Sequence, residues 1–462
     1  MDSTDEGVFY DTTISPTDLS RANIAHFKVT TANVGDINAS FNAGGWINKL
    51  FNGNATKITP LMFMISKVVD VSTLLLNSVA ENGCAINMFY DCEFLTSAPL
   101  CTISNSVGDN AFLNTFRQCY SLSTPMLLNA SLLGERCYMY MYRDSGLVMS
   151  PELPAIELEP YCYYGMFYNC HSLIAAPNLM ATVVPDYAYT YMFQGCSSLV
   201  NPPIFNALTV NSRSCQGMFL ECTSLVSTPE IHTLHFSVAR CFDRMFEGCT
   251  HLVYASDLPA TDATGVELIY RHMFYGCTSL INIPHISLRT VDSKHFSEMF
   301  EGCTALTSVY VYLSSFTSTS SAFYDMFNGC TSIKISETPT SECPNPYRIP
   351  MTGTGIGISS TTENMFANTG GTFTGTPELN KTYYTNATLV YGYADNPTQN
   401  LIINHLTLAQ YQAITPDPHQ LYIIDDGLEY ETVNNKVTSL SGEVTEDNYP
   451  SARAVYNAVV AA

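Results

Sequence analysis

Positive charge is scarce in this sequence. Only 19 Lys and Arg residues stand against 41 Asp and Glu residues in a chain of 462, which gives a formal net charge of −22 at pH 7. Such a chain repels phosphate backbones and anionic membrane surfaces, and the sequence has no basic stripe that would offset the deficit. Nucleic acid is therefore excluded as an expected partner.

Long apolar runs are also missing. The stretch from Leu61 to Leu76 is interrupted by Lys67 and Asp70, so no run reaches the length of about 18 residues that a membrane span needs. The first six residues are acidic, whereas a secretory signal starts with basic residues and continues into an apolar core. We expect neither a membrane span nor Sec export. Charged residues make up only 13% of the chain and hydrophobic ones 46%, a composition that predicts a folded protein.

What the sequence does contain is a repeated phrase, Met-Phe-x-Gly-Cys-x-Ser-Leu. Its cysteines are spaced by 26, 26, 27, 28, 26 and 27 residues between Cys170 and Cys330. Earlier copies end at Cys92 and Cys119, and a degenerate copy ends at Ser145. A fixed period of this size predicts a solenoid, in which each repeat forms one coil and stacks on its neighbours.

Each coil carries the same pattern of signals. The residues just before the cysteine, such as 188–193, predict a short helix or helical turn with Met and Phe inward, and Gly195 and its equivalents permit the left-handed conformation that ends it. An aliphatic residue three positions after the cysteine predicts a buried ladder along the stack. A proline four residues further, as at Pro203, predicts that the following strand is short.

Sixteen cysteines are present, and their positions form two ladders rather than a disulfide framework. Nine occupy the repeat position, and five more lie seven or eight residues earlier. Equivalent residues of stacked coils lie about 4.7–5 Å apart. We therefore expect small, buried, reduced side chains, with redox or metal chemistry as the weaker alternative.

The fold class that we predict is α/β but β-rich: a leucine-rich-repeat solenoid of about 11 coils, with short strands and short helical turns, plus a small C-terminal α+β module. Residues 1–45 form an N-terminal arm or cap, 46–379 the solenoid and 380–462 an assembly or attachment module. In that module the sequence predicts a helix over 406–414, a strand over 421–424 and a terminal helix from Pro450. The apolar stripe of the terminal helix comprises the candidate assembly residues Ala452, Val455, Tyr456 and Val459.

The repeated phrase resembles the BspA-like leucine-rich repeats of surface proteins from gut and oral bacteria. The match covers roughly residues 50–375 and recurs at least nine times. This resemblance implies a surface adhesion or recognition role and leaves the ligand open.

Two further segments resemble tailed-phage proteins. Residues 406–425 are similar to a segment of phage fibre and virion proteins, and residues 436–441 with 449–456 are similar to virion fibre proteins of phages that infect Bacteroides-type bacteria. Together with the acidic N-terminus and the reduced cysteines, these resemblances favour a virion protein that assembles in the host cytoplasm.

Candidate binding residues follow from comparing the coils. The position after the proline holds Glu230, Asp257 and His285, and we expect it to face solvent. Tyrosine offers a flat apolar face with a polar tip, and Tyr310 and Tyr312 form one of several tyrosine runs. These runs either cover coil edges and meet neighbouring subunits or contact a glycan.

No catalytic, cofactor or metal site is predicted. Glu152, Glu157 and Glu159 cluster locally, but no pair recurs on one face at the separation that glycoside hydrolysis needs. The pair His232 and His235 lacks companion ligands.

We therefore predict a non-enzymatic bacteriophage virion component, a head or tail fibre or appendage, that presents a recognition or packing surface. Its expected partners are other virion proteins, further copies of itself, with a trimer by analogy with fibres, and a host-surface glycan or protein. The alternatives are a secreted BspA-type surface adhesin and a polysaccharide depolymerase.

Overall fold

The structure is a computed structural model that divides into two compact units, Met1–Tyr393 and Ala394–Ala462. It describes residues 82–391 with gaps at 84, 99, 103–104, 237, 262, 264, 289–290, 292, 312–315, 318–320, 350–354 and 357–359. Outside that range it describes only the strands 6–10, 24–28, 75–77, 403–406, 421–424, 430–433 and 436–440.

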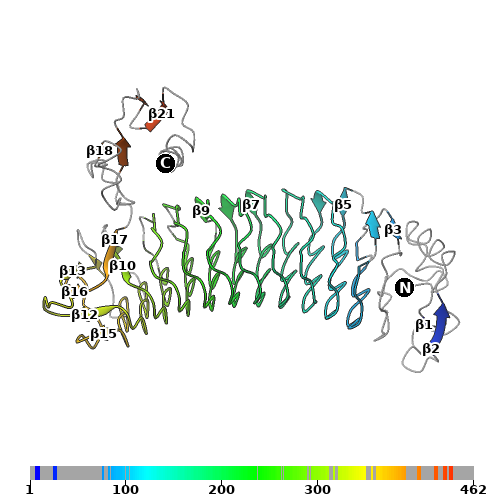
Figure 1. Cartoon of the computed structure of the whole chain (residues 1–462), viewed down its shortest axis with the longest axis horizontal. Coiled ribbons are helices and arrows are strands. Elements are labelled where there is room, and N and C mark those ends of the chain that lie inside the picture. The colour runs from blue at the N-terminus through cyan, green and yellow to red at the C-terminus, as the bar shows by residue number, and fades with distance from the viewer. Residues whose placement is uncertain are drawn as a thin grey trace. The chain divides into compact units, whose positions relative to one another are not determined.

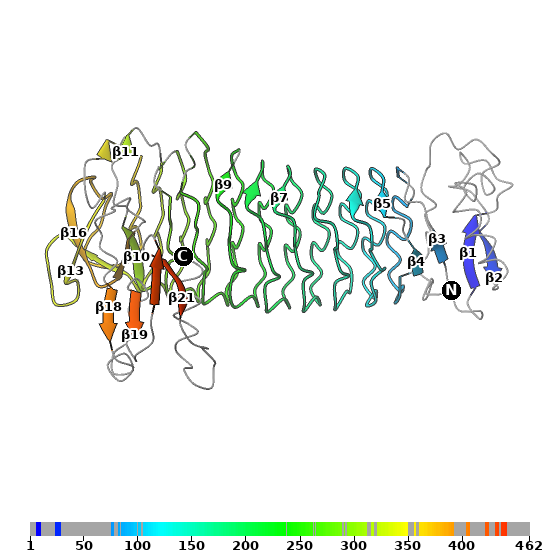
Figure 2. The same ribbon diagram turned by 90° about the horizontal axis from the view of Figure 1, so that it is seen from above.

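The repeats of the first unit stand side by side in a row (Figures 1 and 2). Neighbouring repeats are joined by backbone hydrogen bonds that run in register from one coil to the next. Tyr189 N donates to Ser214 O at 2.8 Å and Phe193 N donates to Met218 O at 2.9 Å, for example. Parallel pairing between equivalent residues of successive coils makes this a β-rich repeat fold.

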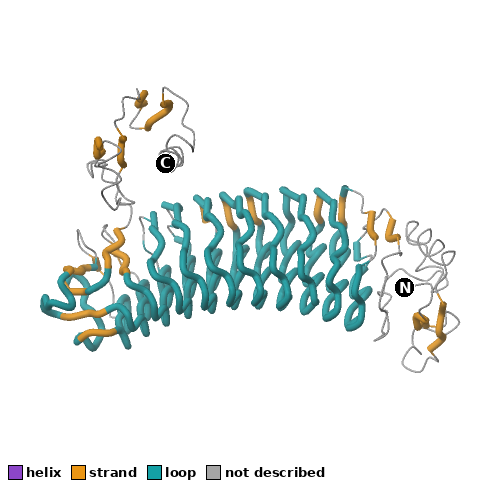
Figure 3. Tube along the Cα trace, viewed as in Figure 1, coloured by secondary structure: helices purple, strands orange, loops and turns teal. Residues whose placement is uncertain are grey.

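The strands within the repeats are only two to four residues long, and most of each coil is loop and turn (Figure 3). Parallel pairs join β3 (Leu75–Asn77) to β4 (Leu100–Thr102), β5 (Ser106–Val107) to β6 (Leu132–Leu133), and β7 (Val183–Val184) through β8 (Thr209–Val210) to β9 (His235–Phe236). Isolated parallel bridges, such as Ala175 with Asn201, link the coils at other points. The sheets contain two to four strands and stay open.

The helical turns predicted before each cysteine are wrong, because the described residues contain no helix. Instead, alternate backbone amides bond within the coil and to the next coil. Met192 N donates to Tyr189 O three residues back, whereas Phe193 N donates onward to Met218 O. A helix would use every amide internally and leave none to hold the neighbouring coil.

A residue with positive φ recurs every fourth position in this part of the coil and prevents a helix from forming. In one repeat these residues are Tyr187, Tyr191 and Gly195, with φ of 58°, 54° and 73°. The left-handed glycine was predicted and is confirmed. The tyrosines were not predicted, because only the hydrogen bonds to both neighbouring coils make φ > 0 tolerable for such a side chain. We call residues from ten to one before the cysteine position the turn segment.

The core confirms the predicted inward face. An unbroken ladder of eleven stacked rings runs through the described coils, with neighbouring centroids 5.3 to 6.0 Å apart. Its members are Phe89, Phe116, Tyr142, Phe167, Phe193, Phe219, Phe246, Phe274, Phe300, Phe327 and Phe366. The aliphatic ladder is fully buried from Leu95 to Ile333.

The described cysteines are free thiols and buried, as predicted. At the repeat position most of the thiols donate to a main-chain carbonyl of the preceding coil, as Cys196 does to Phe167 O at 3.1 Å. Burial raises the pKa of the Cys196 thiol well above its usual value. The ladder thiols are therefore small core groups held in the protonated form.

The far end of the row is built differently. There β10 (Ser308–Val311) pairs with β17 (Thr388–Tyr391), and β11 (Phe316–Thr317) pairs with β14 (Gly355–Ile356). One sheet has the order β13 (Asn345–Arg348), β16 (Thr382–Thr385), β12 (Lys334–Ser336) and β15 (Gly370–Gly371). Strands β16 and β17 thus belong to the repeat unit, so the division between the units falls after Tyr393 rather than after residue 379.

The remaining strands lie near the two termini. Strands β1 (Glu6–Tyr10) and β2 (Ile24–Lys28) pair antiparallel within the predicted arm. In the second unit, β18 (Ile403–Leu406) pairs with β19 (Leu421–Ile424), the predicted strand, and β20 (Tyr430–Val433) pairs with β21 (Lys436–Leu440).

Several predictions fall outside the described residues. These are the helix predicted over 406–414, except for Leu406, which ends strand β18, and the terminal helix with its candidate assembly residues Ala452, Val455, Tyr456 and Val459. In the described part of the chain, no helix has the length and hydropathy of a membrane span.

Candidate recognition surface

Three of the five predicted binding residues lie where the sequence placed them. Glu230 and Asp257 are exposed and His285 is partly exposed, in equivalent positions of three successive coils. His285 N donates to Asp257 Oδ1 at 3.0 Å, which ties two of these coils together. Tyr310 is a correction: it is 2% exposed, because β10 packs into the core and its hydroxyl donates to Ile286 O. Tyr312 lies outside the described residues.

A richer surface lies on the turn segment. At the position nine residues before the cysteine position, successive coils carry Arg136, Tyr161, Tyr187 and Arg213. The two tyrosine rings stack with centroids 4.5 Å apart. The Arg136 guanidinium lies 4.9 Å from the Tyr161 centroid, and that of Arg213 lies 5.7 Å from the Tyr187 centroid. The four side chains form a continuous stack with a guanidinium at each end.

A second row of tyrosines borders this stack. Tyr140, Tyr164 and Tyr191 meet edge to face, with centroids 5.2 and 6.0 Å apart. Two glycines with positive φ make room for their rings. A Cβ on Gly165 would stand 2.4 Å from the Tyr140 ring, and one on Gly217 would stand 2.5 Å from the Tyr191 ring.

Two more arginines extend this cluster. Arg143 lies over Tyr140 and Tyr168, at 5.0 and 4.4 Å from their centroids, and Arg117 lies 5.9 Å from the Tyr140 centroid. We call this cluster the tyrosine–arginine surface. It comprises Arg117, Arg136, Tyr140, Arg143, Tyr161, Tyr164, Tyr168, Tyr187, Tyr191 and Arg213.

The tyrosines of this surface are half-buried. Desolvation, followed by the neighbouring tyrosines, raises the pKa of Tyr164, and desolvation also raises the pKa of Tyr161 and Tyr191. Neutral phenols can both donate and accept hydrogen bonds. The surface therefore offers flat rings, hydroxyls and planar cations held by a rigid backbone.

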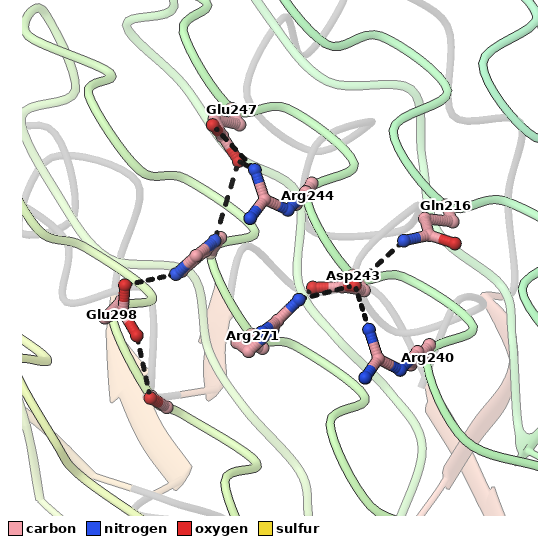
Figure 4. A network of polar contacts seen from close by, with 9 residues as sticks. Gln216, Arg240, Asp243, Arg244, Glu247, Arg271 and Glu298 are labelled. Carbon is pink, nitrogen blue, oxygen red and sulfur yellow. Dashed lines mark hydrogen bonds and ion pairs between the residues drawn. The ribbon is translucent and has the colours of Figure 1, made fainter.

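The same turn segment, three coils further on, carries a polar network (Figure 4). Asp243 is fully buried and accepts from Arg271 at 3.0 and 3.1 Å and from Gln216 at 3.0 Å, while Arg240 stands 3.7 Å away. The bonds link three successive coils. A buried carboxylate that is bonded in this way is satisfied, so the network stabilises the stack.

Next to it lies a group of carboxylates around His272. The His272 ring contacts Glu298, and its Nδ1 lies 3.7 Å from Glu247. The hydrogen bond from His272 lowers the pKa of Glu298. Burial, followed by the charges of Asp325 and Glu298, raises the pKa of Glu301 to about 7. Burial also raises the pKa of Glu247.

These groups do not form a metal site. Across the described residues, no cluster of three or more His, Cys, Asp or Glu side chains has the proximity to hold an ion. Of the pair His232 and His235, which lacks companion ligands in the sequence, His232 lies 3.7 Å from the exposed Glu230.

Charge is strongly segregated within the coil. Between residues 82 and 330, every described Lys and Arg lies on the turn segment: Arg117, Arg136, Arg143, Arg213, Arg240, Arg244, Arg271 and Lys294. Sequence reasoning weighed the tyrosine runs but missed this pattern. The alignment of Arg136, Tyr161, Tyr187 and Arg213 by distance from the cysteine position was the available signal.

No family model matches the chain, and no curated protein matches it. Two solved structures resemble it. One is a leucine-rich repeat protein from Bacteroides ovatus, at 18% identity over 66% of this chain and 78% of that chain, with a TM-score of 0.33. The other is a leucine-rich repeat protein from Eubacterium ventriosum, at 14% identity over 66% of this chain and 84% of that chain, with a TM-score of 0.33.

At these identities and TM-scores, the likeness says nothing about a ligand or an activity. Both structures are described as leucine-rich repeat proteins, and neither is described as a virion protein. The resemblance of residues 406–425 and 436–456 to phage proteins therefore finds no support in these comparisons, and the virion role stays a prediction.

Proposed function

We propose that this chain is a non-catalytic recognition protein of the surface-adhesin kind, and that its tyrosine–arginine surface binds an acidic glycan. The observation that carries the proposal is the continuous stack of Arg136, Tyr161, Tyr187 and Arg213. Tyrosine and arginine dominate the energetics of binding surfaces because they combine large contact area with directional polar groups.

The chemistry of this stack fits a sugar ring that bears a carboxylate. Tyrosine rings offer flat apolar faces to the C–H faces of sugars, and their neutral hydroxyls bond to sugar hydroxyls. The planar guanidiniums match the two oxygens of a carboxylate. Arg136 is engaged at 3.0 Å with Glu135, a contact that is about half exposed and so costs little to exchange for a ligand.

Rigidity favours binding as well. The backbone that carries the stack is bonded to both neighbouring coils, as Tyr161 N is to Asp186 O at 3.1 Å and Tyr187 N is to Ser212 O at 3.0 Å. A ligand that binds there orders little protein, so less of its binding energy is spent on lost conformational freedom.

The proposal is tested by screening acidic and neutral glycans for binding to the full chain, followed by titration calorimetry. We expect acidic glycans to bind, and Tyr161→Ala, Tyr187→Ala and Arg213→Ala each to weaken binding by at least about tenfold, or about 1.4 kcal/mol. Tyr254→Ala is the matched control, because Tyr254 is 66% exposed outside the turn segment. Unchanged affinity in all three variants, or a preference for neutral glycans, would reject the site.

The surface location is tested separately. Immunogold labelling of intact cells should mark their exterior, whereas labelling confined to purified phage particles would support the virion prediction instead. Incubation with a bound polysaccharide should release no oligosaccharide, and release would instead support the depolymerase alternative.

A further inference from the structure

One face of the repeat unit carries no Asp, Glu, Lys or Arg. It is formed by the residues one to six positions after the cysteine position in eight consecutive coils, or one to five in the shorter coil of Ser145, and we call it the charge-free face. Its segments are 120–125, 146–150, 171–176, 197–202, 223–228, 250–255, 278–283 and 304–309. Not one of the 19 basic and 41 acidic residues falls within them.

An aliphatic row runs along the middle of this face. Successive coils place Val148, Ile174, Val200, Val226, Val253 and Ile281 directly after the buried aliphatic ladder. Five of the six side chains are 39 to 50% exposed, and that of Val253 is partly exposed. At either end the row continues as the exposed polar residues Ser123 and Thr307.

The backbone under this row is tied from coil to coil, by amide bonds along most of the row and, between the coils of Ile174 and Val200, by the bridge of Ala175 with Asn201. Ile174 N donates to Val148 O at 3.0 Å, Val226 N to Val200 O at 3.2 Å and Val253 N to Val226 O at 2.9 Å. The aliphatic side chains therefore stand at regular intervals of about 4.8 Å on a firm support.

Several hydroxyls beside the row already have partners. Thr278 Oγ1 donates to Thr250 O at 3.3 Å, and Thr304 Oγ1 donates to Thr278 O at 3.3 Å. Covering these hydroxyls would leave their protons bonded, so their desolvation penalty is small. An extended aliphatic row of this kind on a solvent-exposed face is typical of an interaction surface.

We propose that the charge-free face binds the same face of a second copy of this chain, with the two copies antiparallel. Each copy carries a formal net charge of −22, so most approaches between copies bring carboxylates together. The charge-free face is where two copies can meet without that repulsion. A two-fold axis closes such a pair, because each copy then uses the same patch.

The charges at the ends of the face set the orientation. Glu93 is the first charged residue met beyond one end, on the coil of Cys92, and Lys334 is the first beyond the other end, on the coil of Cys330. The coils of Cys92 and Cys330 are the first and the last of ten, so the midpoint of the row lies between the coils of Val200 and Val226. An antiparallel pair then places the coil of Glu93 opposite the coil that carries the second copy's lysine, three positions across the face, whereas a parallel pair would bring the two glutamate-bearing coils together.

The size of the face fits a reversible dimer. Eight coils at about 4.8 Å and six residues at about 3.3 Å give at most roughly 760 Å² per copy. The total of at most roughly 1,500 Å² falls within the lower half of the range of specific interfaces. We therefore expect a dissociation constant in roughly the micromolar range.

Sedimentation of the full chain over a range of concentrations tests the proposal. The wild type should dimerise, and more tightly as ionic strength rises from about 0.01 M to about 0.15 M, because salt screens the repulsion. Val200→Glu and Val226→Glu should each weaken dimerisation by at least about a hundredfold. Val183→Glu is the matched control, since Val183 is 54% exposed in β7, outside the charge-free face, and it should dimerise like the wild type.

Unchanged thermal unfolding would show that the glutamate variants are folded. A wild type that is monomeric at all concentrations, a trimer, or a dimer that survives both glutamates would overturn the proposal. Glycan binding by the wild type is measured independently, so failure of the dimer leaves the proposed function standing.

Carbodiimide coupling tests the orientation. It joins a carboxylate to an amine as an amide with loss of water, and the antiparallel dimer should yield a Glu93–Lys334 link. These residues lie at opposite ends of ten coils, so the link cannot form within one copy. Lys334 also contacts Glu342 at 3.2 Å, and that internal link is the positive control for the reaction. Lys334→Arg should abolish both links and keep the dimer, whereas a dimer that yields only the internal link would overturn the antiparallel orientation.

Discussion

The two halves of each coil are held to the next coil in different ways. On the turn segment, every fourth residue has positive φ and alternate amides bond to the next coil, as with Tyr187 and Tyr191. On the other half, short parallel bridges and strands such as β7 and β8 hold the coils together. Between residues 82 and 330, the turn segment carries every described basic residue and most of the tyrosines, whereas the charge-free face carries valine, isoleucine, serine and threonine.

The difference shows what each backbone geometry allows. Irregular turns point side chains in several directions, so long side chains of one coil can lie over the next, as Tyr140 lies over Gly165. An extended segment repeats one direction and builds a flat row. One half therefore suits selective contacts, and the other suits a flat partner.

The largest expected effect on stability comes from a substitution in the core that both halves share. Phe193→Ala removes a ring that stacks at 5.6 Å on Phe167 and 5.4 Å on Phe219. It should lower the free energy of unfolding by about 3–5 kcal/mol, because the cavity cannot collapse between two supported coils. Urea unfolding measures the change. Val200→Ala, on the exposed row, is the control and should cost less than about 1 kcal/mol.

A somewhat smaller effect should follow from breaking the polar network. Asp243→Asn removes the buried charge that Arg271 bonds to, and we expect a loss of about 3 kcal/mol because the arginine is left without its counter-charge. Denaturant unfolding provides the measurement. Asp257→Asn is the matched control on the exposed half of the coil. An equal loss there would show that the buried position of Asp243 adds nothing to the cost of removing the charge.

The third prediction sharpens the role of the turn segment. Gly217 has a φ of 57°, and an added Cβ would meet the Tyr191 ring at 2.5 Å. Gly217→Ala should cost about 1–3 kcal/mol, from the backbone strain plus displacement of the ring. Gly265→Ala has a similar φ of 75° and nothing within 4 Å of its Cβ, so it isolates the backbone cost.

Removing the ring tests that reasoning. Tyr191→Ala should make Gly217→Ala cheaper, and a double-mutant cycle by thermal unfolding measures the coupling. Strict additivity of the two substitutions would contradict the ring contact.

The smallest effect concerns pH. The folded-state pKa of Glu301, about 7, lies above its ordinary value of 4.5, so the folded state holds this proton more tightly. That contribution is fully present below about pH 4.5 and is lost as the pH rises through about 7. Because the carboxyl is partly exposed, the change should stay below about 1 kcal/mol.

Glu301→Gln should flatten this part of the pH profile of unfolding, measured between pH 4 and pH 8 at roughly constant ionic strength. Glu230→Gln is the exposed control. If the free energy of unfolding of the wild type instead rose with pH through this window, and the rise were absent in Glu301→Gln, the assigned sign would be reversed.

The repeat itself was readable from the sequence, and so was much of the core. The inward Met192 and Phe193, the aliphatic ladder and the left-handed Gly195 all follow from local chemistry repeated at a fixed period. The helical turn was wrong because the apolar spacing of such a segment does not distinguish a helix from successive turns that bond to a neighbour. Tyr310 was misplaced because its coil meets β17 instead of another repeat.

By itself the sequence determined the period, the inward residues and the absence of charge from one face, because each depends only on residue type at a position in the repeat. The tertiary structure decided the rest. The positive φ of Tyr187, the room above Gly217 and the stack that joins Arg136 to Arg213 all require the next coil to be in place. A side chain gains or loses these contacts only when residues about 26 positions apart are brought side by side by backbone hydrogen bonds.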